Sequence, residues 1–169
     1  MKKLKQIVSY GLITSLLCSV SLIVNAKTLY GRVVNVADGD TVTILDSSKQ
    51  QHRIRLLHID APERGQAFGR VAQKALAQKI NKRQVQVKYK EKDRYGRILG
   101  EIILNGENIN LWLVQNGYAW PYFRYNPPAY YLDAYRVAKL YKNGLWQDPN
   151  PIEPETFRHK SKQKQSKND

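Results

Sequence analysis

Short stretches rich in β-branched residues, separated by turn residues, dominate the first half of this 169-residue chain. Such stretches are typical of half-buried strands, because branched side chains pack well on a pleated surface. Five of them predict strands: residues 28–36, 41–45, 52–59, 84–90 and 97–104. The first three are expected to form an antiparallel meander, and the Asn105-Gly106 turn should end the fifth.

Three helices are expected among these strands. Apolar residues recur at helical spacing from Phe68 to Ile80, and residues 110–116 and 128–143 predict two more helices, each followed or ended by a glycine. The buried stripe of the last helix is expected to hold Tyr131, Ala134, Tyr135, Ala138 and Tyr141. Short strands with interposed helices predict an α+β, mostly β protein, built as a five-stranded OB-fold barrel with three α-helices.

Residues 1–26 have the pattern of a secretory signal peptide. Three lysines precede an apolar run over residues 7–24, and Val24-Asn25-Ala26 ends it with small residues. We expect cleavage after Ala26 and a secreted or periplasmic protein without a stable membrane anchor. The alternative is an uncleaved anchor, for which the apolar run is near the lower limit of length.

Cysteine content and charge narrow the chemistry of the remaining chain. Cys18, the only cysteine, lies inside the predicted signal peptide, so a mature chain has neither a disulfide nor a thiolate metal site. Without the three lysines of that segment, 25 basic residues stand against 14 acidic ones, a net charge of +11. Such a charge favours a polyanionic partner, either nucleic acid or an anionic membrane.

The end of the chain has a different composition from the predicted domain, residues 27–147. Residues 148–169 contain several prolines and are then almost wholly polar. We expect a disordered, basic tail, which either attracts phosphate groups or serves as a solubilising end.

Three polar clusters carry the candidate chemistry: residues 38–41, 53–63 and 93–97. Each has an ordinary structural explanation, respectively a turn, a strand that ends before a cap, and a solvated hairpin. In combination they suggest phosphodiester hydrolysis, because that reaction needs a nucleophile and a way to neutralise phosphate charge.

The residue types suit these tasks. Asp40 and Asp60 could converge on one hard cation, with carbonyl oxygens and waters completing its coordination. Glu63 follows a proline that stiffens the turn and could act as a general base. Arg55 and Arg97 carry planar guanidinium groups that bind phosphate oxygens bidentately.

The order of these residues resembles the staphylococcal nuclease (thermonuclease) family. The matching motifs are Asp-Gly-Asp-Thr-Val at 38–42, Arg-Leu-Leu-x-Ile-Asp-x-Pro-Glu at 55–63 and Asp-x-Tyr-Gly-Arg at 93–97. The likeness extends over residues 28–146. It implies a five-stranded barrel with three helices, Ca2+ as the cofactor, DNA and RNA as substrates, and cleavage of the P–O5′ bond to leave 3′-phosphate ends.

The resemblance also implies roles for individual residues. Asp40 and Asp60 match the calcium carboxylates, and Ala61 stands where a backbone carbonyl binds the metal. Glu63 matches the general base, and Arg55 and Arg97 match the phosphate-binding arginines. Tyr95 matches one of two aromatic residues that lie near the nucleotide in the family. Tyr125 is the simplest match for the second.

Two segments depart from the family pattern. Residues 64–66 are shorter than the lysine-rich loop of the best-known member, which leaves binding of the 3′ side open. Tyr122 and Phe123 compete with Tyr125 for the second aromatic position. These aromatics could instead be core residues, or a stacking platform without a catalytic role.

Three functions therefore remain open: a monomeric exported nuclease, a nucleic-acid-binding barrel that has lost catalysis, and a basic cell-surface adhesin. A binding module would be expected to lack part of the catalytic set, since carboxylates next to a polyanion weaken binding. All five acid, base and arginine positions are filled, and the chain has no internal repeats. The sequence favours the nuclease.

Overall fold

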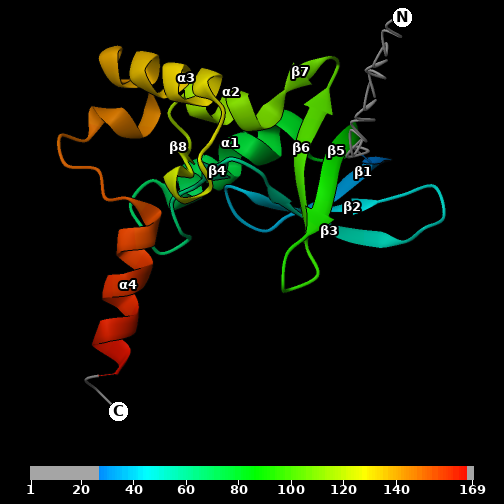
Figure 1. Ribbon diagram of the computed structural model, residues 1–169, viewed down its shortest axis with the longest axis horizontal. Helices are drawn as coiled ribbons and strands as arrows, with labels where there is room; N and C mark the ends of the chain where they lie inside the picture. Colours follow the sequence, from blue (N-terminus) through cyan, green and yellow to red (C-terminus); the bar gives the residue numbers. More distant parts are fainter. Residues whose placement is uncertain (1–26, 167–169) are drawn as a thin grey trace, which may run out of the picture.

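The computed structural model describes residues 27–166, and most strands in this part of the chain form one closed barrel (Figure 1). The strands are β1 Lys27–Val36, β2 Thr41–Leu45, β3 Gln51–Leu56, β4 Ile59–Asp60, β5 Gln84–Lys92, β6 Ile98–Leu104, β7 Glu107–Asn108 and β8 Trp120–Pro121. The order β3-β2-β1-β5-β6 is closed by parallel pairing of β3 with β6. The predicted five-stranded OB-fold barrel is confirmed.

The long strand β1 is shared by two halves of the barrel. Its first half pairs with β5 and its second half with β2, and the register shifts between Val33 and Asn35. Gly31 lies where the strands crowd, because a Cβ there would lie 2.5 Å from Ile44 Cγ2 and 2.6 Å from the Leu45 carbonyl oxygen. Glycine is required at this position so that β1 can curve between its two partners.

The strand expected over residues 52–59 is in fact divided. β3 ends at Leu56, and the chain turns at His58, whose φ of 68° lies in the left-handed region. Ile59 and Asp60 then form β4, which pairs with β8 outside the barrel. This turn redirects the chain, so that Asp60 is presented at one end of the barrel.

The described residues contain four α-helices, one more than expected. They are α1 Gly69–Ile80, α2 Ile109–Gln115, α3 Ala129–Leu140 and α4 Pro154–Gln165, with two short 3-10 helices, η1 Phe123–Tyr125 and η2 Gly144–Gln147. The predicted stripe of α3 is correct for Tyr131 and Ala138, which are fully buried, but wrong for Tyr141, which is 72% exposed. α3 ends at Leu140, one residue before Tyr141.

The expectation of a disordered tail is wrong for residues 154–165, which form α4. Pro154 is in the first turn, where its missing N–H costs nothing, and Glu155 suits the positive end of the helix dipole. The predicted signal peptide, residues 1–26, lies outside the described residues.

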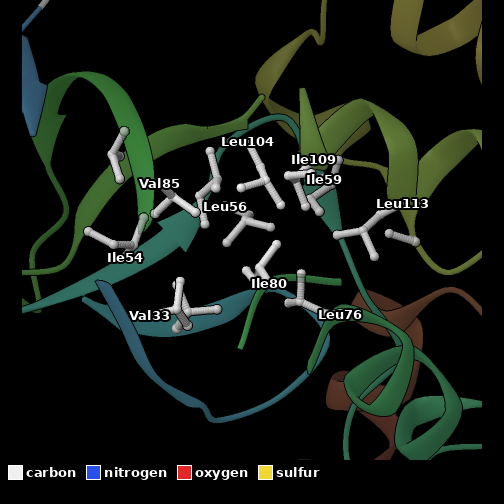
Figure 2. Packing of buried hydrophobic residues seen from close by; sticks show 14 of the residues in the cluster. Val33, Ile54, Leu56, Ile59, Leu76, Ile80, Val85, Leu104, Ile109 and Leu113 are labelled. Atoms are coloured by element: carbon white, nitrogen blue, oxygen red, sulfur yellow. The ribbon is translucent and has the colours of Figure 1, made fainter. Parts of the chain in front are cut away.

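Two hydrophobic clusters hold the elements together. The larger combines side chains of the barrel with those of α1 and α2, and Figure 2 shows Leu76 and Ile80 meeting Val33 and Leu56 in it. The smaller contains Trp120, Ala138, Leu145 and Trp146, with the two indoles edge to face at 4.4 Å. The smaller cluster fixes β8, and β8 in turn fixes β4 and the aromatic segment that follows.

Across the described part of the chain, none of the helices has both the length and the apolar character needed to cross a bilayer.

Candidate active site

All eight residues predicted for the site line one groove of about 1220 Å³ at one end of the barrel. They are Asp40, Arg55, Asp60, Ala61, Glu63, Tyr95, Arg97 and Tyr125. They come from the turn before β2, from β3 and β4, from the loop before α1, and from the β5–β6 hairpin and η1, which are far apart in the sequence. The barrel thus brings together the three polar clusters that the sequence singled out.

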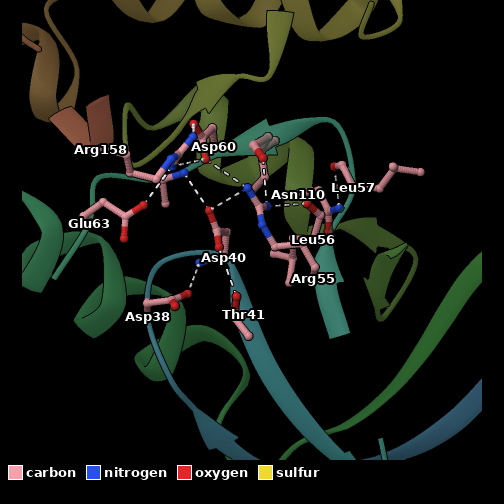
Figure 3. Close-up of polar contacts among 12 residues, drawn as sticks. Asp38, Asp40, Thr41, Arg55, Leu56, Leu57, Asp60, Glu63, Asn110 and Arg158 are labelled. Atoms are coloured by element: carbon pink, nitrogen blue, oxygen red, sulfur yellow. Dashed lines mark hydrogen bonds and ion pairs between the residues drawn. The ribbon is translucent and has the colours of Figure 1, made fainter. Parts of the chain in front are cut away.

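Two buried carboxylates form the floor of the groove. Asp40 is 7% exposed and Asp60 is 3% exposed. Arg55 Nη2 donates to Asp60 Oδ1 at 2.9 Å and lies 3.2 Å from Asp40 Oδ2 (Figure 3). Because both carboxylates reach the same nitrogen, their oxygens converge on one small region.

Arg55 is held from the other side by the divided strand. Its Nη1 donates to the carbonyl oxygens of Leu56 and Ile59, at 2.8 and 2.9 Å, across the turn between β3 and β4. Ile54 and Leu56 point into the core, so the alternation of β3 turns Arg55 the opposite way, toward the groove. The sequence predicted that Arg55 points away from Ile54 and Leu56, and this orientation is confirmed.

Glu63 stands in the tight loop between β4 and α1. Its backbone N–H donates to the side-chain Oε1 of Gln66 at 3.1 Å, and the Gln66 N–H donates back to the Glu63 carbonyl at 2.8 Å. Gly69 begins α1 against this loop, and a Cβ there would overlap the Glu63 carbonyl. This close approach fixes the Glu63 backbone, while its carboxylate remains 39% exposed toward the groove.

Arg97 reaches the groove from the β5–β6 hairpin. Asp93 holds it there, because Arg97 Nε donates to Asp93 Oδ2 at 2.8 Å and the Arg97 N–H donates to Asp93 Oδ1 at 2.9 Å. The guanidinium also lies over the Tyr95 ring, 5.6 Å from its centroid. Arg97 makes no direct contact with the acid pair among the described residues, so the two arginines flank the groove from different elements.

The tyrosines of the groove are Tyr89, Tyr95, Tyr122 and Tyr125. Tyr95 and Tyr125 are 67% and 63% exposed, so neither serves as a core residue. Tyr122 packs edge to face with Tyr125 at 4.8 Å and lies under Arg55, 5.9 Å from the guanidinium carbon. Phe123 packs instead on Tyr135 of α3. Tyr122 and Tyr125, and not Phe123, therefore form the aromatic surface on this side of the groove.

The carboxylates of Asp40 and Asp60 suit a hard cation, although two carboxylates alone do not complete its coordination shell. Within residues 27–166, no three His, Cys, Asp or Glu side chains gather as a ready metal cluster. Asp40 and Asp60 supply two converging, buried anions, and oxygen ligands of other kinds would have to complete a coordination shell. Ala61 lies beside them, since its N–H donates to Asp40 Oδ2 at 2.8 Å. This donor set fits calcium.

Burial of the acids also favours a cation here. Burial raises the pKa of Asp60, although hydrogen bonding to Arg158 and attraction to Arg55 act in the opposite direction. Burial, followed by repulsion from Asp40, raises the pKa of Asp38 to about 6. A further positive charge at this position would relieve both effects.

The sequence did not predict that Arg158, on α4, belongs to this site. Arg158 donates to both oxygens of Asp60 and to Glu63 Oε1 (Figure 3). Burial acts to lower the pKa of Arg158, but hydrogen bonds to Asp60 and Glu63 raise it above its usual value. The proline and acid at the start of α4 could have indicated the helix, but no sequence signal indicates the contact.

Comparisons with known proteins agree with this geometry. Residues 53–148 match the sequence profile of the family described as staphylococcal nuclease homologue. A protein named uncharacterized endonuclease in Haemophilus influenzae is 42% identical over 131 residues, covering 78% of this chain and 74% of its own. One of the same name in Escherichia coli is 41% identical over 133 residues, covering 78% of this chain and 86% of its own.

A protein named micrococcal nuclease in Shigella flexneri is 43% identical over 143 residues, covering 78% of this chain and 82% of its own. The profile begins after Asp40 and ends before α4, so the groove includes residues on both sides of it. The chain belongs to the staphylococcal nuclease family and is a hydrolase that acts on phosphodiester bonds of nucleic acids.

Proposed function

We propose that this protein is an exported, calcium-dependent nuclease that cleaves DNA and RNA at the P–O5′ bond and leaves 3′-phosphate ends. The observation that carries the proposal is the convergence of two buried carboxylates, a partly exposed glutamate and two arginines on one groove. Exposed tyrosines and lysines continue the groove beyond this cluster, as a polyanion with stacked bases requires.

The arginines would bind the scissile phosphate. Among the described contacts, Arg55 keeps its Nε–H and Arg97 keeps both Nη groups for a ligand, so they can contact different non-bridging oxygens of one phosphate. Asp93 and the Leu56 and Ile59 carbonyls hold the two guanidinium groups before substrate arrives. Such preorganised donors stabilise the charge that builds up on the phosphate oxygens in the transition state.

Glu63 would act as the general base. Its carboxylate takes a proton from water, the resulting hydroxide attacks phosphorus, and the P–O5′ bond breaks. The phosphate stays on the 3′ side with the new oxygen, and O5′ leaves as an alcohol after it takes a proton from solvent water. Asp40, Asp60 and the Ala61 carbonyl would hold the calcium ion, which supplies positive charge beside the phosphate.

A cleavage assay tests this proposal. The purified protein is expected to degrade single-stranded DNA and RNA with calcium, to stop when a chelator is added, and to leave 3′-phosphate ends. Arg97→Ala should lower kcat by about 10²–10³, and Arg97→Lys should recover little, because lysine lacks the planar fork. Arg136→Ala is the control, since that exposed arginine pairs with Asp133 on α3 and does not line the groove.

The same assay distinguishes an enzyme from a binding module. If the calcium-supplied protein cleaves no faster than the double variant Glu63→Gln, Arg97→Ala, the catalytic proposal is wrong and binding without cleavage remains. End groups identified by mass spectrometry check the bond that is cut, and 5′-phosphate products would contradict the proposed P–O5′ cleavage.

Export rests on the pattern of residues 1–26. The mature protein, recovered from the periplasm or the medium, is expected to begin at Lys27. Mass spectrometry of its N-terminal peptide measures this directly, and an uncleaved chain in the membrane fraction would support the anchor instead.

A further inference from the structure

α4 and the segment just before it are attached to the active-site end of the molecule at three points. Gln66, in the loop that carries Glu63, donates to the Ile152 carbonyl at 2.6 Å, just before the helix. Arg124, next to the groove tyrosines, pairs with Glu155 at 2.8 Å. Arg158 makes the third attachment, inside the groove. The docking of α4 thus involves the same loop and segment that shape the site.

Arg158 binds the carboxylates as a fork. Its Nη2 donates to Asp60 Oδ2 at 2.8 Å, and its Nη1 donates to Asp60 Oδ1 at 3.1 Å and to Glu63 Oε1 at 2.8 Å (Figure 3). Asp60 is almost fully buried, so water competes weakly for these hydrogen bonds. One guanidinium thereby neutralises both a proposed cation ligand and the proposed base.

These contacts use the groups that the cation and the reaction need. Both oxygens of Asp60 already accept hydrogen bonds from arginine, and Asp60 Oδ1 accepts from Arg55 as well. A calcium ion requires oxygen lone pairs that point at it, and it repels a guanidinium that shares the same carboxylate. Arg158 also occupies Glu63 Oε1, an oxygen that would otherwise be open to the attacking water.

We propose that α4 is an intramolecular competitor of the cation: Arg158 holds Asp60 and Glu63 until calcium displaces it, and the released helix frees the base. The proposal rests on the calcium site of the proposed function. Linkage makes the effect reciprocal, so docked α4 weakens calcium binding and bound calcium weakens docking to the same extent. The tail therefore raises the calcium concentration at which the enzyme becomes active.

Calcium titration by calorimetry, without nucleic acid, tests the competition. Arg158→Ala is expected to bind calcium about tenfold more tightly than the unmodified protein, within the usual range of coupling between sites. Lys160→Ala is the matched control, because it removes the same charge from an exposed position of α4 outside the groove. Its calcium affinity should equal that of the unmodified protein.

Glu155→Gln separates competition from simple charge effects. Loss of this carboxylate removes an attraction for calcium, so electrostatics alone predicts weaker binding. Loss of the Arg124–Glu155 pair also loosens α4, so competition predicts tighter binding. Tighter binding supports the proposal, whereas equal or weaker binding contradicts it, and neither result depends on the fold of the Arg158 variant.

Hydrogen exchange gives the reciprocal measurement. In the unmodified protein, the amides of residues 154–165 are expected to exchange faster when calcium is saturating. Unchanged exchange, or a calcium affinity that Arg158→Ala leaves equal or lower, would overturn the competition while leaving the nuclease proposal intact. Calcium binding to none of these proteins would overturn both the competition and the calcium assignment.

Discussion

At the β5–β6 hairpin, one carboxylate organises both the turn and the arginine beyond it. Asp93 Oδ1 accepts hydrogen bonds from the N–H groups of Tyr95 and Arg97, and its Oδ2 accepts from Arg97 Nε. Partial burial acts to raise the pKa of Asp93, but the hydrogen bonds from Arg97 and from the backbone lower it below the usual value. A single residue thus fixes the position of Arg97 before any phosphate binds.

Asp93→Asn is expected to lower the free energy of unfolding by about 1 kcal/mol at neutral pH, because charge-assisted hydrogen bonds become neutral ones. A lowered pKa contributes stability above the unfolded value of about 3.9, and this contribution is lost as pH falls through the folded value. Urea unfolding of both proteins at pH 7 and near pH 3 measures the difference. A gap between them that does not shrink in acid would contradict this role.

At the scale of elements, one polar side chain of α2 holds the helix against the place where β3 and β6 close the barrel. Asn110 is fully buried in the first turn of α2. Its Oδ1 accepts from the Ile102 N–H, and its Nδ2 donates to the Gly100 carbonyl at 3.0 Å and to the Leu57 carbonyl at 2.9 Å, near which it lies in Figure 3. These groups flank the β3–β6 pairing that closes the barrel, so Asn110 joins the helix to the seam.

Asn110→Ala should reduce the free energy of unfolding by about 2–4 kcal/mol, since it leaves buried backbone groups without partners. Asn110→Asp should not restore the loss, because a carboxylate cannot donate to the two carbonyls. Denaturant unfolding measures both variants, with the exposed Asn150→Ala as a control expected to change little. A loss below about 1 kcal/mol for Asn110→Ala would show that water replaces its hydrogen bonds.

At the scale of the whole molecule, basic residues outnumber acidic ones two to one, and one wall of the groove is basic. The chain has 28 basic and 14 acidic residues, a formal charge of +14. Basic residues stand along the wall formed by β5 and the hairpin, and others line the groove from α4: Lys88, Lys90, Lys92, Arg94, Arg158 and Lys162. Such a wall would attract a nucleic-acid backbone without reading the identity of its bases.

Lys88→Gln with Lys90→Gln should weaken binding of single-stranded DNA measured without calcium. If each lysine neutralises one phosphate, the slope of log K against log salt should fall in magnitude by about 1.4. Arg70→Gln with Lys74→Gln is the matched control, because these exposed residues of α1 lie outside the groove. An equal change in both double variants would mean that net charge, and not the groove, governs binding.

Local pattern was enough to predict most of the barrel. The strand expected over residues 41–45 has those bounds in the structure, and the Asn105-Gly106 turn has positive φ at both residues, as that dipeptide favours. The division of the strand at His58 was not predicted, because no glycine or proline marks the turn. Arg55 stabilises this turn by donating hydrogen bonds to the carbonyls of Leu56 and Ile59. These hydrogen bonds form only once the chain has folded.

By itself, the sequence determined the barrel, the acids and arginines of the groove, and the family, because strand periodicity and motif spacing are local properties of the chain. Only the tertiary structure decided that Asp40 and Asp60 meet on Arg55 and that Arg158 reaches the same carboxylates. Asp60 and Arg158 are separated by 98 residues. Their contact depends on how β4, β8 and α4 pack, and a pattern read along the chain does not contain that information.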